Sequence, residues 1–174
     1  MEKGAKLLGH HIHPMLIVFP LGLLSTAFIF DIAFAATTRG TFAYLAYWLI
    51  PAGLIGGIVA ALFGWIDWLA IPSGTRAKSI GLIHGTVNAG VLLIFFGSWW
   101  LRPNSQTNPG LAPFVLSIAG ALLALLGGWL GGELVERLGI GVHKGANPNA
   151  PSSLRSDSAF ATANERQDHE AETH

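Results

Sequence analysis

Four long apolar stretches make up most of the chain, and short polar links separate them. The stretches run over about residues 14–36, 42–70, 80–101 and 111–135. Each reaches the ~20 residues that a helix needs to cross a hydrocarbon core about 30 Å thick. The links are rich in Gly, Pro, Ser and Asn, which end helices, and links this short make neighbouring helices run antiparallel. The pattern predicts an all-α fold, an integral membrane four-helix bundle with up-down-up-down topology.

Composition agrees with this class and excludes several functions. Of the 174 residues, 51% are hydrophobic and 11% are charged, whereas soluble domains carry about 25% charged residues. The formal net charge is zero without any basic run, so a nucleic acid is not an expected partner. Cysteine is absent, which excludes disulfides, thiolate metal sites and iron–sulfur ligation and leaves oxygen and imidazole ligands. No Walker loop, nucleophile elbow or catalytic triad pattern is present, so it stays open whether the protein is an enzyme.

The chain changes from mainly apolar to mainly polar near residue 144, and this change predicts the domain organisation. Residues 1–144 are expected to form the four-helix membrane domain, and the polar residues 145–174 a disordered tail, because they hold too little apolar surface to offset ordering entropy. A cleavable signal peptide is an alternative for the first stretch, since Ala33-Phe34-Ala35 resembles a cleavage site. That apolar run is longer than the usual signal core, which favours a first membrane helix.

Lysine and arginine predict the orientation in the membrane. The first and third links hold only Arg39 and Arg102. The N-terminus, the second link and the start of the C-terminal segment hold the others near the helices: Lys3, Lys6, Arg76, Lys78, Arg137 and Lys144. This bias predicts that both termini and the second link lie in the cytoplasm, on the inner side of the plasma membrane. Glycine pairs four residues apart, such as Gly53 and Gly57, predict close helix packing within the bundle or between copies in a homo-oligomer.

The side chains that can carry chemistry collect at one end of the predicted bundle. They are His10, His11 and His13 before the first helix, Asp67 near the end of the second, His84 and Asn88 in the first turns of the third, and Glu133 and His143 near and beyond the end of the fourth. Asp31 alone belongs to the opposite end. Ionisable groups inside membrane segments are costly and usually face the bundle interior. The sequence therefore predicts a cytoplasmic-side cluster of histidines and carboxylates.

His84 is the most informative member, because it lies at least one turn inside an apolar helix with Asn88 on the same face. One interpretation is a hydrogen bond to Asp67 or to a backbone carbonyl that stabilises the bundle. Others are ligation of a metal or haem, and proton transfer.

The carboxylates also allow two interpretations. Asp67 is expected either to pair with Arg76 or Lys78 or to orient a ligating imidazole. Glu133 is expected to pair with Arg137, four residues on in the same helix.

The order and spacing of these residues resemble a known family. The residues that carry the resemblance span about 10 to 143: His13-Pro14, Asp31, Gly64-x-x-Asp67-Trp68, His84 with Asn88, Gly132-Glu133-Leu134-Val135, Gly139-x-Gly141-Val142 and His143. Together they are similar to the bacterial domain-of-unknown-function family 2231, a membrane domain without an assigned activity. In some members the domain is joined to Rieske-type iron–sulfur or cytochrome modules, so the resemblance implies a redox setting. This chain contains no such module and no cysteine.

Three functions from different classes follow. In the first, His13 and His84 are the axial ligands of one b-type haem, with Asn88 beside them, in a membrane subunit that has a redox partner. Proline is favoured at the first helical position, so His13-Pro14 predicts that His13 caps the first helix while His84 lies inside the third.

The second function is a non-haem zinc, iron or manganese site, or a proton site, and its candidate ligands mix nitrogen and oxygen: His13, Asp67, His84, Glu133 and His143. The third is a structural or assembly subunit of a larger membrane complex, in which the polar cluster fixes helix register. Substitution of His84 by Ala separates loss of a bound cofactor from simple loss of stability.

Overall fold

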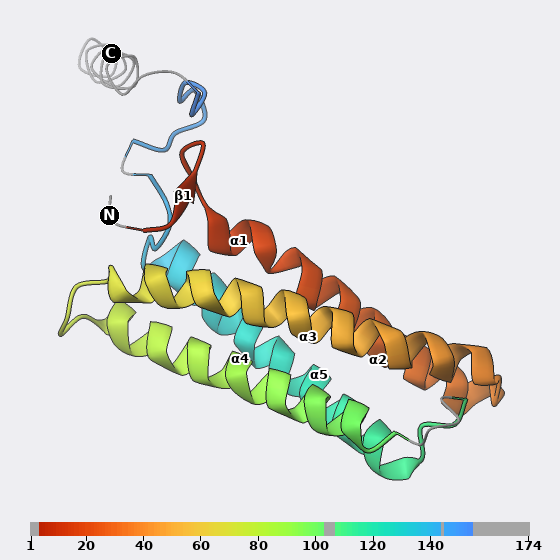
Figure 1. Cartoon of the computed structure of the whole chain (residues 1–174). Coiled ribbons are helices and arrows are strands. Elements are labelled where there is room, and N and C mark those ends of the chain that lie inside the picture. Colours follow the sequence, from red (N-terminus) through yellow and green to blue (C-terminus); the bar gives the residue numbers. More distant parts are fainter. Residues whose placement is uncertain (1–3, 103–106, 144, 155–174) are drawn as a thin grey trace, which may run out of the picture.

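The computed structural model describes residues 4–102, 107–143 and 145–154, and its long helices lie side by side (Figure 1). Helices α1 (Ile12–Leu16) and α2 (Val18–Thr37) form the first span, followed by α3 (Gly40–Leu69) and α4 (Arg76–Trp100). Helix α5 (Leu111–Gly132) continues into a π-helical segment, η1 (Glu133–Arg137). All four are long and apolar enough to cross a membrane. The predicted all-α fold with four membrane helices is confirmed.

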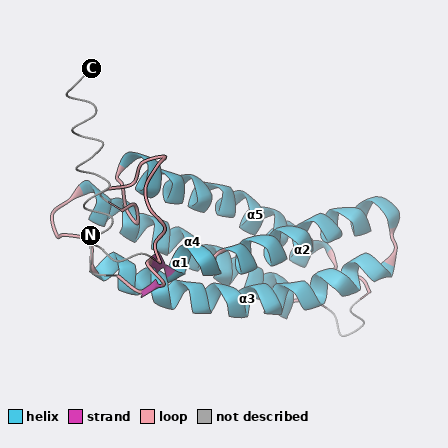
Figure 2. Ribbon diagram, turned by 90° about the horizontal axis from the view of Figure 1, so that it is seen from above, coloured by secondary structure: helices cyan, strands magenta, loops and turns pink. Residues whose placement is uncertain are grey.

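The helices pack as two hairpins. Helix α2 packs most extensively on α3, and α4 on α5, while the two pairs meet along α3–α4 and α2–α5. We call residues 12–69 the first hairpin and residues 76–137 the second hairpin. Figure 2 shows the same arrangement from above, with the connections at the two ends of the bundle.

The buried core is small, and most large apolar side chains face outward. The core cluster consists of Leu24, Ala27, Ala46, Ile50, Leu54, Val91 and Phe95. Leu93, Trp100 and Leu125 are among the many apolar side chains left exposed. Lipid tails are as apolar as leucine, so packing in a bilayer depends on close helix approach more than on removal of apolar surface from water.

Glycines provide that close approach at three contacts. A Cβ added at Gly53 would lie 2.7 Å from Leu24 Cδ2, one at Gly120 2.8 Å from Phe95 Cε2, and one at Gly57 2.5 Å from Leu92 Cδ2. The predicted glycine pairs therefore differ in role. Gly53 and Gly57 lie in helix contacts, whereas Gly128 and Gly132 face open space.

Two segments begin differently from the prediction. Helix α4 starts at Arg76 rather than at residue 80, because the Thr75 hydroxyl caps it by accepting the Lys78 N–H at 3.2 Å. Helix α1 starts at Ile12, and Pro14 sits in its first turn, where a missing N–H is tolerated. His13 is therefore the second residue of a helix and not its cap.

A small β-ribbon that the sequence did not predict precedes α1. Strand β1 (Lys6–Leu7) pairs antiparallel with β2 (His10–His11). The turn residues Leu8 and Gly9 have φ of 50° and 84°, and positive φ at both positions is typical of a type I′ hairpin turn. Of the predicted tail, residues 145–154 form turns, with Ser153 against Gly9, while residues 155–174 lie outside the described part of the chain.

The glycine contacts can be tested on one helix. We expect Gly120→Ala to destabilise the protein by about 1–3 kcal/mol, because its Cβ would press on the buried Phe95 ring. Gly128→Ala on the same helix meets no atom within 4 Å and is expected to be neutral or slightly stabilising. Thermal unfolding in detergent, followed by circular dichroism, compares the two. Equal unfolding temperatures would contradict a close packing contact at Gly120.

Candidate functional site

Asp67, near the end of α3, anchors the β-ribbon to the bundle. Its Oδ1 accepts a hydrogen bond from the Ala5 N–H at 3.0 Å and lies 3.2 Å from Nδ1 of His11. The predicted pairing of Asp67 with Arg76 or Lys78 is wrong. Lys78 Nζ instead donates to the Trp68 carbonyl at 2.8 Å and lies 3.9 Å from the centroid of its ring. A cation over an indole face is attracted by the ring quadrupole, which gives Lys78 a partner of its own.

Glu133 joins the two helices of the second hairpin. It is the first residue of η1, and its Oε1 accepts a hydrogen bond from Arg76 Nη2 at 2.5 Å. The predicted pairing with Arg137 is therefore wrong, since Glu133 pairs with Arg76 at the start of α4 instead. Asp67 and Glu133 both stabilise contacts between segments.

His13 is held by the backbone of α3. Its Nδ1 lies 2.8 Å from the Ala60 carbonyl oxygen. A carbonyl oxygen only accepts, so Nδ1 carries the proton and a neutral ring keeps its lone pair on Nε2. The ring packs against Gly64, where an added Cβ would lie 2.9 Å from it.

His84 has the same kind of environment in the second hairpin. Its Nδ1 lies 3.0 Å from the Gly127 carbonyl oxygen, and a Cβ added at Gly131 would lie 3.2 Å from its ring. Of the two predicted structural partners of His84, the backbone carbonyl is present and Asp67 is not. Asn88 Nδ2 donates to the His84 carbonyl at 2.8 Å and lies 3.4 Å from both ring nitrogens.

The two histidine rings lie opposite each other where the hairpins meet, in an edge-to-face arrangement. Their ring centroids are 6.5 Å apart, and the ring planes are nearly perpendicular at 89°. The other predicted ligands lie elsewhere, since Asp67 and Glu133 have the partners given above and His143 lies in an exposed turn, where Nδ1 accepts the Gly145 N–H at 3.1 Å. No group of three or more His, Cys, Asp or Glu in the described segments is placed to hold a metal ion.

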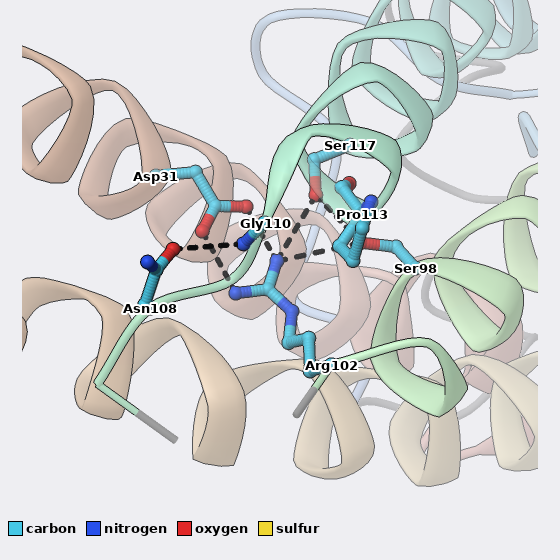
Figure 3. A network of polar contacts seen from close by, with 7 residues as sticks. All are labelled: Asp31, Ser98, Arg102, Asn108, Gly110, Pro113 and Ser117. Carbon is cyan, nitrogen blue, oxygen red and sulfur yellow. Dashed lines mark hydrogen bonds and ion pairs between the residues drawn. The ribbon is translucent and has the colours of Figure 1, made fainter. Parts of the chain in front are cut away.

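A buried ion pair at the opposite end of the bundle was missed by the sequence reasoning. Arg102 donates from Nη1 to Asp31 Oδ1 at 2.9 Å and from Nη2 to Oδ2 at 2.6 Å (Figure 3). Its Nη2 also lies 3.3 Å from the hydroxyls of Ser98 and Ser117. Both charged side chains are fully enclosed, with 0% of Asp31 and 1% of Arg102 exposed. The available signal was Asp31 itself, because a carboxylate inside an apolar stretch requires a cationic or hydrogen-bonding partner at the same level.

Comparison with known proteins identifies the family of this chain. No curated protein and no solved structure matches the chain. Residues 9–144 match the sequence profile of the family described as "Predicted membrane protein (DUF2231)". That range includes all four membrane helices, both histidines of the facing pair and the ion pair. The predicted resemblance is confirmed, and this multi-pass membrane protein belongs to the DUF2231 family.

Proposed function

We propose that His13 and His84 bind one b-type haem between the two hairpins, and that the protein is a redox-associated subunit of the membrane. One observation carries the proposal. Each hairpin supplies one imidazole, both Nδ1 atoms are held by backbone carbonyls, and the rings face each other at 6.5 Å.

The protonation state of both rings suits ligation. A histidine ligates a metal through its unprotonated nitrogen, and the other ring N–H is commonly donated to a carbonyl oxygen or a carboxylate. Nδ1 of His13 and of His84 both make this second contact. Metal–imidazole bonds are about 2 Å long, so two rings on opposite sides of one metal have centroids roughly 6 Å apart. The observed separation agrees with that spacing.

The number of protein ligands favours haem over a free metal ion. Zinc sites in proteins use three or four protein ligands, and the described residues bring only two histidines together. A haem supplies four nitrogens of its own and requires only axial ligands from the protein. When bound, it would supply one-electron chemistry through the ferric and ferrous states of its iron.

Glycines give both imidazoles room against the neighbouring helix. A Cβ added at Gly64 would lie 2.9 Å from the His13 ring, and one at Gly131 would lie 3.2 Å from the His84 ring. Each ring can therefore approach the backbone closely enough to reach its carbonyl partner.

A visible absorption spectrum of the detergent-purified protein tests the proposal. Protein expressed with adequate haem is expected to show an intense near-ultraviolet band that sharpens and shifts when dithionite reduces it. His13→Ala and His84→Ala are each expected to lose the six-coordinate low-spin spectrum, because each removes one axial ligand. His10→Ala is the matched control, since the exposed His10 ring is hydrogen-bonded to the Leu8 carbonyl and is not one of the two proposed ligands. A flat wild-type spectrum would contradict haem binding and favour a structural or assembly subunit.

We also infer that the histidine end faces the cytoplasm, in the inner membrane. The bias of Lys and Arg toward this end supports that orientation. A fluorescent protein fused after residue 174 is expected to fluoresce, and alkaline phosphatase fused there is expected to be inactive. The same reporters fused within the first link, after Arg39, are expected to give the opposite result. Active phosphatase at the C-terminus would contradict this orientation and show that the histidine end faces away from the cytoplasm.

A further inference from the structure

The two hairpins are built alike around their histidines. His13 bonds the carbonyl of Ala60, and Gly64 lies one turn farther along α3. In the second hairpin, His84 bonds the carbonyl of Gly127, and a glycine again follows one turn later. The same spacing thus gives the same local contact in both halves.

The likeness extends along the full length of the helices. Leu23 and Leu24 lie over Gly53 in the first hairpin. Ile94 and Phe95 lie over Gly120 in the second. Leu24 follows His13 by the same number of residues as Phe95 follows His84. The helices that carry the two histidines also run in the same direction, so the halves are related by a pseudo-twofold axis along the bundle.

The ion pair occupies equivalent positions in this repeat. Asp31 follows His13 by the same number of residues as Arg102 follows His84. The axis therefore passes between two facing histidines at one end and between an acid and a base at the other. Along a helix with about 1.5 Å of rise per residue, these two pairs are roughly 27 Å apart.

The position of one histidine relative to the other depends on how the hairpins dock, because in the described part of the chain the hydrogen bonds of each ring stay within its own hairpin. Ala60 belongs to the first hairpin, as His13 does, and Gly127 to the second, as His84 does. Among the described residues, hydrogen bonds cross between the hairpins at two places. Trp68 and Lys78 bond beside the short link that joins the hairpins, and Asp31 bonds Arg102 at the far end.

The ion pair of Asp31 and Arg102 has the geometry needed to fix how the two hairpins dock. The guanidinium meets both carboxylate oxygens, and a bidentate pair restricts angle as well as distance. Figure 3 shows the hydroxyls of Ser98 and Ser117 beside the same guanidinium, so Arg102 is held firmly in its own hairpin. We propose that Asp31 and Arg102 are positioning residues, which fix how the two hairpins dock and thereby hold His13 and His84 opposite each other.

A double variant tests this without leaving a buried charge unpaired. Asp31→Leu with Arg102→Met replaces the pair by apolar side chains, an exchange that buried ion pairs often tolerate or gain from in stability. Because the chain has no cysteine, spin labels can be placed at Met15→Cys and Ile83→Cys, which are exposed and close in sequence to His13 and His84. Electron paramagnetic resonance spectroscopy on the full chain in detergent then measures the distance between the two spin labels.

A single narrow distance is expected with the ion pair intact, and a broad or shifted distribution in the double variant. Arg76→Gln is the matched control, because the contact of Arg76 with Glu133 stays within the second hairpin at the histidine end. We expect it to keep the narrow distance. A double variant with an unchanged distribution would overturn the proposal. If that variant fails to fold, Asp31→Asn with Arg102→Gln retains polar groups without the charges and is judged by the same distance.

The haem readout rests on the proposed function, and the distance readout does not. In haem-loaded protein, the double variant is expected to gain a high-spin, five-coordinate fraction, because one imidazole no longer reaches the iron. A wild-type protein that binds no haem would contradict the proposed function. The positioning role of Asp31 and Arg102 would then be judged from the distance between the labels alone. An unchanged low-spin spectrum together with an unchanged distance would refute the positioning role while leaving haem binding in place.

Discussion

Asp31 and Arg102 place opposite charges inside the bundle, where their side chains are 0% and 1% exposed. Each charge alone would be strongly unfavourable in that environment, and each comes from a different hairpin. Their pairing therefore links the position of one hairpin to that of the other. Desolvation offsets much of the Coulomb attraction, so such a pair adds more to the choice of one arrangement than to overall stability.

Between the two ends, glycine makes the rest of the geometry possible. In a helix, the carbonyl of one residue accepts the N–H four residues later and keeps a second lone pair. A side chain at that later position covers the carbonyl, and a glycine leaves it open. Ala60 is followed by Gly64, and Gly127 by Gly131, which is why an imidazole from a neighbouring helix reaches each carbonyl. By leaving these carbonyls open, the two glycines allow each carbonyl to accept the Nδ1–H of a histidine. Nε2 of each ring then remains for a ligand.

The helices could be predicted from the sequence because apolar length alone determines which segments cross a bilayer. The meeting of His13 and His84 also followed from topology, since both come from the same end of parallel helices. The partners of Asp67 and Glu133 did not follow, because they depend on helix rotation and on the path of the N-terminal ribbon, which hydropathy does not describe. Arg102 was assigned to a link because it follows the last apolar residue of its stretch. Asp31 indicated that some partner was needed at this level, and the comparison of the two hairpins position by position identifies Arg102 as that partner.

The two ends of the pseudo-twofold axis differ in a way that bears on the proposed haem site. Equivalent positions in two like hairpins naturally present like residues, as His13 and His84 do. Two aspartates or two arginines buried at the other end would repel each other without any compensating charge, so the contact there requires the halves to differ. Like residues facing across an axis suit a ligand whose two faces are chemically the same. A haem iron, with an open axial position on each face of its ring, has that property, whereas a tetrahedral zinc ion would require ligands that the facing pair does not supply.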